Sequence, residues 1–426
     1  MPIDFNLTKE QIQIRNIACE MAAVFAMNAE EHDKNRSSPI ENYSLLKDAG
    51  FFGLSVPKQY GGMGAGLLGW VIACEELAKG CCATTLAFNM HINSVGFVME
   101  NKLISEKVKK RVAEEVIKKS KLLCYAVSEP STSSLIISTC APSVKAKKVS
   151  GGYILNGCKA FISNWEASDY AYMYAREEDD PNPDSAVGLL VPTKSQGAKV
   201  TDWWHTLGMR ATRSQKINLE DVFVPQELLL HRTENFIEFF VSGGPAWSFG
   251  AYTAVYLGVG LAILDEAKRL LKARVPKGYS QSIGYHPDIR RKITQMSCMM
   301  EAAQHAMYKA AWVHEHEPDN LTKILASLFK AKYVVGESVA KTAQLATSAC
   351  GLHALFKGEK LERLIRDATT APIMPPNSDS CASLIGLLEL GLDINEALDP
   401  LKQTEAEVFR ERNVKSKEQS QQPVSA

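Results

Sequence analysis

Three stretches of this 426-residue sequence hold residue types that could do chemistry. Gly64-Ala-Gly-Leu-Leu-Gly69 matches the G-x-G-x-x-G pattern, which lets a main chain approach the pyrophosphate of a dinucleotide when it links a strand to a helix. His314 and His316 could be metal ligands. Residues 177 to 180 carry four acidic side chains in a row.

None of these stretches has the setting that its chemistry needs. The glycine pattern stands between predicted helices, and the next acidic residue after Glu76 is Glu100, beyond the offset of roughly 20 residues expected for a ribose-binding carboxylate. His314 and His316 point to different faces of a helix because they are two residues apart. The acidic run is typical of a solvated loop tip. Local motifs therefore predict no metal site and no nucleophile with its base.

The elements that would position a site follow three successive patterns, and the first is helical. Thr8 and Gln11 form a capping box, and apolar residues recur at helical spacing from Ile14 to Phe25. Further helical stretches surround the glycine-rich loop, and the pattern stays helical up to about Lys121. We therefore predict a helical N-terminal domain over residues 1–121.

The second pattern consists of short β-rich runs separated by turn residues. Tyr153 to Leu155 and Ala160 to Ile162 flank Asn156-Gly157, a dipeptide suited to a tight hairpin. Similar runs continue to Pro225. We predict an antiparallel β domain over residues 122–233.

The third pattern is helical again, with long segments at three-and-four spacing. They predict a C-terminal four-helix bundle over residues 234–412, whose helices run from Phe249 to Ala273, His286 to His314, Leu321 to Ala349 and Cys381 to Leu390. Residues 413–426 are rich in Ser, Gln and Lys and are predicted to be disordered. The predicted fold class is α+β.

Composition excludes several functions. Lys and Arg total 48 and so do Asp and Glu, and no basic tract stands apart, so no nucleic-acid binding is expected. The apolar runs are too short for a membrane span. The ten cysteines form no C-x-x-C pair, and the N-terminus resembles no targeting peptide, so we expect a cytoplasmic protein without disulfides or structural zinc.

Five segments, in order, are similar to motifs of one flavoprotein family. The sequence resembles the acyl-CoA dehydrogenase family, whose fold has the same order of helical, β and helical domains. The matching segments are Gly50-Phe-Phe-Gly-Leu-Ser-Val-Pro-Lys-Gln-Tyr-Gly-Gly-Met-Gly64, Tyr125-Ala-Val-Ser-Glu-Pro-Ser-Thr-Ser-Ser134, Asn156-Gly-Cys-Lys-Ala-Phe-Ile-Ser-Asn164, Leu207-Gly-Met-Arg210 with Asp221-Val-Phe-Val-Pro225, and Glu362-Arg-Leu-Ile-Arg-Asp-Ala368.

The resemblance implies an FAD site between the β domain and the bundle. By position in the motifs, the flavin-contacting residues would be Tyr125, Val127, Ser128, Phe161, Ser163 and Asn377. On the same basis Ser134 would reach toward the CoA part of the substrate, and Arg210 would be a local donor for a CoA phosphate.

The sequence departs from the family where the catalytic carboxylate is expected. Pro375 occupies the position of the usual Glu, and Ser248 occupies the alternative Glu position in the first long bundle helix. Asp379 is the one carboxylate near the usual loop. It is predicted either to be the catalytic base or to cap the helix that starts near Cys381. The resemblance therefore implies a divergent member that lacks the usual catalytic Glu.

The implied reaction is the α,β-dehydrogenation of an acyl-CoA in fatty acid metabolism, with hydride transfer to flavin N5 and an electron-transfer flavoprotein as electron acceptor. Two alternatives stay open. One is a flavin-dependent monooxygenase of the same fold, and the other is a non-catalytic scaffold that has lost tight flavin. The family also implies a homodimer or a homotetramer.

Overall fold

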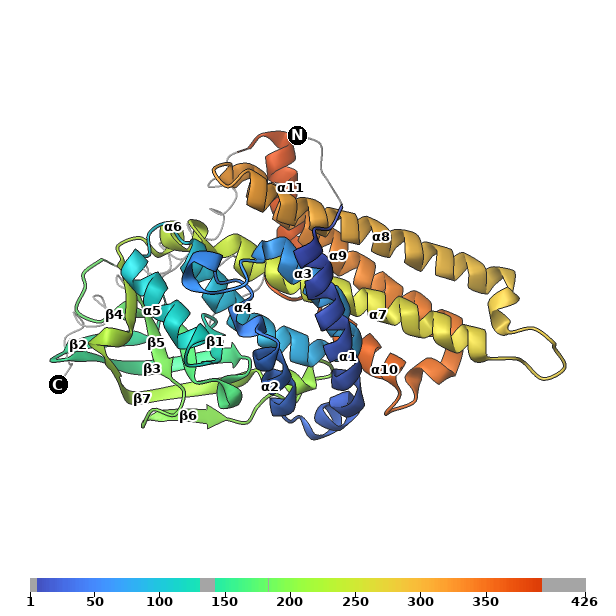
Figure 1. Cartoon of the computed structure of the whole chain (residues 1–426), viewed down its shortest axis with the longest axis horizontal. Helices are drawn as coiled ribbons and strands as arrows, with labels where there is room; N and C mark the ends of the chain where they lie inside the picture. The colour runs from blue at the N-terminus through green and yellow to red at the C-terminus, as the bar shows by residue number, and fades with distance from the viewer. Residues whose placement is uncertain (1–5, 131–141, 183, 393–426) are drawn as a thin grey trace, which may run out of the picture.

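The chain folds as helices, a β-sheet and then longer helices. The computed structural model describes residues 6–130, 142–182 and 184–392. Figure 1 shows the sheet at one end, the long helices extending to the other, and the N-terminal helices between and in front of them. The predicted fold class is confirmed, whereas the predicted disorder of residues 413–426 falls outside the described residues.

The N-terminal part contains five helices. They are α1 (Lys9–Asn35), α2 (Ile40–Asp48), α3 (Gly66–Gly80), α4 (Cys82–Glu100) and α5 (Glu106–Ile117). The capping box predicted for α1 is present, since the Gln11 N–H donates to Thr8 Oγ1 at 3.2 Å and the Thr8 N–H donates to Gln11 Oε1 at 2.9 Å. Helices α3 and α4 are apolar on nearly every side because other elements of the fold surround them.

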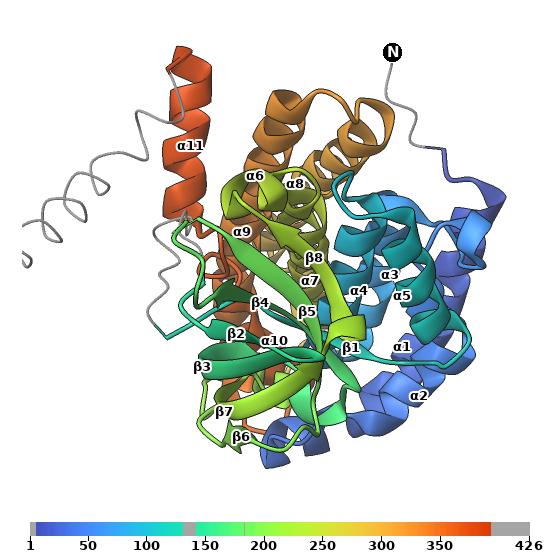
Figure 2. The same ribbon diagram turned by 90° about the vertical axis from the view of Figure 1, so that its left-hand side faces the viewer.

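The middle part is a sheet of eight strands. They are β1 (Leu123–Ala126), β2 (Lys145–Val149), β3 (Gly152–Ile162), β4 (Tyr170–Glu177), β5 (Ala186–Pro192), β6 (Ala198–Thr201), β7 (Gln215–Pro225) and β8 (Leu229–Thr233). The order across the sheet is β6-β7-β3-β2-β4-β5-β8, and β1 pairs with β4. In Figure 2 this sheet faces the viewer, with the N-terminal helices to one side and the bundle behind.

The predicted antiparallel domain is antiparallel in five of the seven strand pairings of the described residues, and the other two pairings are parallel. Strand β4 pairs in parallel with β1 over Tyr170 to Met173 and with β2 at Arg176 and Glu177. The long segments that return the chain between these strands make parallel pairing possible, and sequence alternation does not reveal it.

The predicted hairpin at Asn156-Gly157 is wrong. Strand β3 runs through this dipeptide without turning, and Gly157, with φ +139°, lies where the pairing with β7 shifts register. The turn between β2 and β3 is instead formed at Gly151, with φ +81°. Asn-Gly tolerates the unusual backbone of a bulge as well as that of a turn, so the dipeptide alone does not distinguish them.

Strand β4 separates two hydrophobic cores because its side chains alternate between the two faces of the sheet. Ala171, Met173 and Ala175 belong to the core inside the β domain. Tyr172 and Tyr174 belong to the larger core shared with the helices. The sheet therefore packs against the helical parts through aromatic side chains.

The C-terminal part is a helical bundle. Its helices are α6 (Phe236–Val241), α7 (Ala251–Ala273), α8 (Pro287–His316), α9 (Leu321–Cys350), α10 (Lys360–Ala368) and α11 (Ser378–Leu390), and a π-helical segment, Ala246–Gly250, precedes α7. The helical stretch Ala246–Ala273 is long and apolar enough to cross a membrane, but 89% of its most apolar window is buried inside the protein. It is a core helix of the bundle.

Candidate functional site

A buried ion pair joins two of the sequence motifs. Glu129 follows β1 and Lys159 lies in β3, and the Lys159 ammonium donates to Glu129 Oε1 at 2.7 Å. Neither side chain is more than 4% exposed. Lys159 also donates to the Val127 carbonyl at 3.3 Å, and the Ala160 N–H donates to the Ser128 carbonyl at 3.0 Å. The segment after β1 is therefore fixed against the end of β3.

Glu129 and the groups around it affect the pKa of each member of this pair. Burial alone would raise the pKa of Glu129, but the Lys159 ammonium and hydrogen bonds from Ser143 hold the pKa below its ordinary value. The Val144 N–H donates to Glu129 Oε1 at 3.1 Å, the oxygen that also accepts from Lys159, whereas Ser143 donates to Oε2. Burial lowers the pKa of Lys159, and Glu129 opposes this shift. A buried carboxylate with these donors is a rigid anchor for the chain around it.

Phe161, at the end of β3, has an unusual backbone and an exposed ring. Its φ is +60°, in the left-handed region that large side chains avoid, and 50% of its surface is exposed. The ring lies 5.1 Å from Trp203 and 6.3 Å from Trp204, centroid to centroid. Both indoles are fixed, because Trp203 Nε1 donates to the Ser214 carbonyl at 3.1 Å and Trp204 Nε1 donates to the Met209 carbonyl at 3.0 Å. Strain of this kind is concentrated at ligand-binding sites.

Polar groups follow directly after Phe161. Ser163 is 5% exposed, and its hydroxyl lies 2.7 Å from that of Ser214. Asn164 is fully buried with φ +65°, and neither its side-chain oxygen nor its side-chain nitrogen has a hydrogen-bond partner in the described part of the chain. Buried polar atoms of this kind can hydrogen-bond a bound ligand.

Tyr125 lies on the helical side of the sheet. Its hydroxyl is 3.5 Å from that of Ser248, which belongs to the π-helical segment before α7. Burial raises the pKa of Tyr125 to about 12, so it is a neutral hydroxyl at physiological pH. Short π-helical segments are frequent at functional sites. The π-helical segment thus meets the first strand through the hydroxyls of Ser248 and Tyr125.

The loop before α11 does not place Asp379 at the cap of that helix. Helix α11 starts at Ser378, three residues earlier than predicted, and Asn377 caps it by accepting from the Ser380 N–H at 2.8 Å. The prediction that Asp379 caps the helix is therefore wrong. Its carboxylate lies in the first turn of α11 and is exposed. Asn377, predicted to contact flavin, is buried and uses its side-chain oxygen for the cap.

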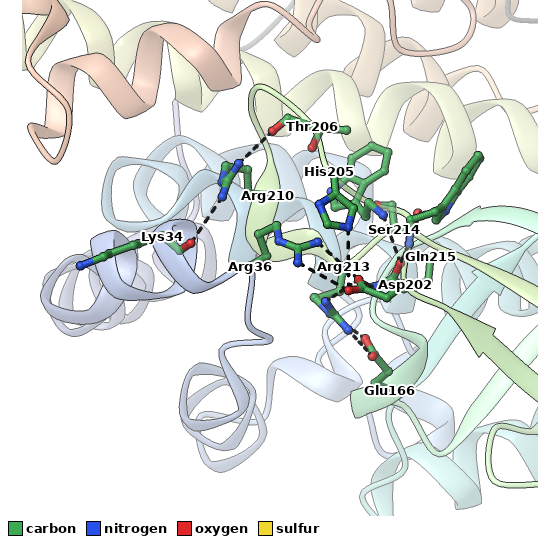
Figure 3. A network of polar contacts seen from close by, with 12 residues as sticks. Lys34, Arg36, Glu166, Asp202, His205, Thr206, Arg210, Arg213, Ser214 and Gln215 are labelled. Atoms are coloured by element: carbon green, nitrogen blue, oxygen red, sulfur yellow. Dashed lines mark hydrogen bonds and ion pairs between the residues drawn. The ribbon is translucent and has the colours of Figure 1, made fainter.

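Arg210 is used mainly for packing α1 against the β domain. Its guanidinium donates to the carbonyls of Asp33 at 2.8 Å, Thr206 at 3.2 Å and Lys34 at 3.4 Å, as Figure 3 shows in part. The same figure shows Arg36 and Arg213 converging on Asp202, at 3.4 Å and 3.1 Å. Ser134, predicted to reach the CoA, lies outside the described residues.

The motifs around Leu207 and Glu362 also lock together. The Met209 N–H donates to Asp367 Oδ1 at 2.6 Å, and a Cβ at Gly208 would lie 2.2 Å from the Arg366 carbonyl. Arg366 pairs with Asp33 of α1 at 2.6 Å. These motifs therefore hold α1, the β domain and α10 in fixed relation.

Sequence reasoning missed the residues that support the site. Glu129 and Lys159 are charged residues inside two of the motifs that resemble the family. Two opposite charges in segments that are otherwise β-rich could have indicated a buried ion pair. Thr212 and Ser214 carried no such signal. Among the described residues, no cluster of three or more His, Cys, Asp or Glu could hold a metal ion.

Known proteins resemble this chain along most of its length. Residues 8–120, 124–222 and 250–381 match the families described as "Acyl-CoA dehydrogenase, N-terminal domain", "middle domain" and "C-terminal domain". A "Probable acyl-CoA dehydrogenase YngJ" from Bacillus subtilis is 28% identical over 375 residues, which is 86% of this chain and 94% of that protein.

Solved structures have the same fold. A glutaryl-coenzyme A dehydrogenase in complex with glutaryl-CoA aligns with a TM-score of 0.79 at 25% identity, covering 92% of this chain and 98% of that one. FMN-bound TdsC from Paenibacillus sp. A11-2 aligns with a TM-score of 0.79 at 23% identity, covering 89% of this chain and 97% of that one. The second likeness concerns the fold alone.

Proposed function

The chain belongs to the acyl-CoA dehydrogenase family of flavin-dependent oxidoreductases, and from this premise we propose that it dehydrogenates an acyl-CoA thioester at its α and β carbons with FAD as cofactor. Relatives of this fold bind FAD or FMN. The observation that carries the proposal is the Glu129–Lys159 pair, because it holds the segment of Val127 and Ser128 against Lys159 and Ala160, directly before Phe161 in β3.

The residues around Phe161 fit a flavin. The exposed, strained Phe161 ring offers a flat surface, and the unpartnered Asn164 amide and the Ser163 hydroxyl offer polar groups beside it. We propose that Tyr125 and the main chain of Val127 and Ser128 contact the same ring. When bound, the flavin would supply the hydride acceptor, and the protein orients the substrate and excludes water.

Removal of the substrate's α-proton needs a base. By the motif resemblance, the two positions where the family has this base hold Pro375 and Ser248 in this sequence. Asp379 is the only carboxylate between residues 369 and 388, so we propose it as the base. Because it is exposed, this role requires a bound acyl-CoA to cover it. Arg210 retains N–H groups beyond the three that bind main-chain carbonyls, and we propose that it and Ser134 contact the CoA part.

The flavin spectrum tests this proposal. Purified protein reconstituted with FAD is titrated anaerobically with acyl-CoA thioesters of increasing chain length, and loss of the oxidised flavin band is the expected result. Asp379→Asn should abolish this bleaching while flavin binding is retained, and Asp379→Glu should retain part of it. If Asp379→Asn bleaches like the wild type, Asp379 is not the base.

One observation favours a second function, that of a flavin-dependent monooxygenase. By the motif resemblance, Ser248 and Pro375 stand where the family has its two alternative carboxylates, and neither residue is acidic. Chemistry that uses oxygen and reduced flavin does not require that carboxylate. Oxygen consumption that occurs only with reduced flavin, without bleaching by acyl-CoA, would support this function. Protein inert in both assays would support a non-catalytic scaffold.

We propose an electron-transfer flavoprotein as electron acceptor, in a cytoplasmic pathway of fatty acid metabolism, and self-association as a homodimer or homotetramer. Exposed apolar side chains after α9 support self-association, since Leu352 and Phe356 are 78% and 58% exposed. Light scattering coupled to gel filtration would measure the assembly. A monomer at micromolar concentration would contradict this part of the proposal.

A further inference from the structure

Three buried hydroxyls form a chain that ends at Ser163. The hydroxyl of Ser163 lies 2.7 Å from that of Ser214, which lies 2.7 Å from that of Thr212. Thr212 Oγ1 lies 2.8 Å from the Met209 carbonyl. Ser163, Ser214 and Thr212 are each no more than 5% exposed. We call these three residues the hydroxyl chain.

The hydroxyl chain can point in either direction. Each hydroxyl has one proton to donate, so every proton of the hydroxyl chain is paired only when the donors all run the same way along it. If Thr212 donates to the Met209 carbonyl, Ser214 donates to Thr212 and Ser163 donates to Ser214. The Ser163 oxygen can then only accept from a ligand. If the direction reverses, Ser163 donates to the ligand.

The Met209 carbonyl allows the reversal at a small cost in free energy. It also accepts from the Thr212 N–H at 3.2 Å and from Trp204 Nε1 at 3.0 Å. A carbonyl oxygen has two lone pairs, so it stays satisfied when the Thr212 hydroxyl turns away. The two directions of the chain therefore differ little in hydrogen bonding within the protein.

We propose that the hydroxyl chain reverses with the redox state of a flavin bound at Ser163, and that Thr212 and Ser214 are positioning residues for that flavin. This inference rests on the proposed function. Oxidised flavin N5 is a hydrogen-bond acceptor, and two-electron reduction by hydride transfer from the acyl-CoA adds a hydrogen there, so N5 becomes a donor. Ser163 would donate to oxidised N5 and accept from reduced N5–H.

Removing one hydroxyl from the hydroxyl chain should weaken the binding of oxidised and of reduced flavin unequally. With Thr212→Val, the oxidised state keeps every hydroxyl proton paired, because Ser214 donates to Ser163 and Ser163 donates to N5. In the reduced state Ser163 donates to Ser214, and the Ser214 proton then has no acceptor. An unpaired buried donor is costly. We therefore expect affinity for reduced flavin to fall about tenfold more than affinity for oxidised flavin.

The test measures flavin affinity in both states. Dissociation constants for oxidised and dithionite-reduced FAD are determined by fluorescence and absorbance for the wild type, Thr212→Val and Ser214→Ala, and the potential of bound FAD is determined by spectroelectrochemistry. The expected tenfold change in the ratio corresponds to a potential about 30 mV more negative. Thr212→Ser keeps the hydroxyl and is the matched control, with a ratio within about twofold of the wild type.

A double-mutant cycle distinguishes an effect that passes through the hydroxyl chain from a general loss of stability. In a Ser163→Ala background, Thr212→Val should no longer change the ratio of the two affinities, because the chain no longer reaches the flavin. Urea unfolding of each apoprotein confirms that the variants fold. If the wild type binds FAD but Thr212→Val leaves the ratio unchanged, the reversing chain is refuted and the proposed function stands. If the wild type binds no flavin in either state, both are refuted.

Discussion

Replacing Lys159 with Met would remove one half of the buried pair and little else. Met has nearly the length and volume of Lys, so the change leaves little cavity in β3. It removes the 2.7 Å contact with Glu129 and the 3.3 Å hydrogen bond to the Val127 carbonyl. Glu129, 3% exposed, then stays buried without the charge of Lys159.

The expected loss of stability is large. Removing one partner of a buried pair costs about 3–5 kcal/mol, because an uncompensated charge remains. Glu129 keeps its hydrogen bonds from the Ser143 main chain at 2.8 Å, the Ser143 hydroxyl and the Val144 N–H at 3.1 Å. Because these hydrogen bonds still stabilise the carboxylate, we expect a cost at the lower end of that range. The free energy of unfolding should fall by about 3 kcal/mol at pH 8.

The loss should depend on pH in a specific direction. In the wild type the lowered pKa of Glu129 stabilises the fold above the ordinary carboxylate range, and this stabilisation is lost as pH falls through the folded-state pKa. In Lys159→Met, burial remains and the pKa of Glu129 rises. The variant should therefore regain stability relative to the wild type between pH 8 and pH 5, as Glu129 becomes protonated.

Urea unfolding followed by tryptophan fluorescence at both pH values measures these quantities, and flavin titration measures the effect on the site. The double variant Lys159→Met with Glu129→Gln carries no buried charge and should be more stable than Lys159→Met alone by about 2 kcal/mol. A loss below about 1 kcal/mol, or one that is the same at pH 5 and pH 8, would refute the reasoning that this pair fixes the site.

Three further predictions concern other parts of the molecule. Glu75, 6% exposed between α3 and α8, has a pKa that burial raises to about 7, so its charge destabilises the fold as pH rises from 4.5 toward 7. Glu75→Gln should raise the free energy of unfolding by up to about 3 kcal/mol at pH 8 and hardly at all at pH 4.5, and equal gains in urea titrations at the two pH values would contradict this. Phe161→Asn should change the stability of the apoprotein by less than about 1 kcal/mol, because relief of the strained backbone offsets lost ring contacts, yet it should weaken FAD binding in a fluorescence titration. An unchanged FAD affinity would mean that the Phe161 ring does not contact the flavin. Arg366→Lys should lower the melting temperature and cost about 1–2 kcal/mol, because Lys cannot reproduce the paired bonds to both Asp33 oxygens at 2.6 and 3.1 Å, and a neutral result would mean that this contact does not hold α1 in place.

The sequence by itself determined the order of the parts and the segments that matter. Helical periodicity before residue 122 and after residue 234, and short β-rich runs between them, follow from local patterns of burial, so they can be read without knowing which elements meet. The capping box at Thr8 is also local, because both partners lie within one turn of helix. The motif resemblance that singles out Phe161 and Ser163 is local too, because it rests on consecutive residues.

The tertiary structure decided what depends on partners distant in the chain. Asn156-Gly157 becomes a bulge because β7 pairs with both sides of it, and Lys159 is buried because Glu129, 30 residues earlier, meets it. The hydroxyl chain joins Ser163 to residues about 50 positions later. Local patterns record which side chains are buried, but the direction of a strand, the partner of a charge and the path of a hydrogen-bond chain are set only when separate segments pack together.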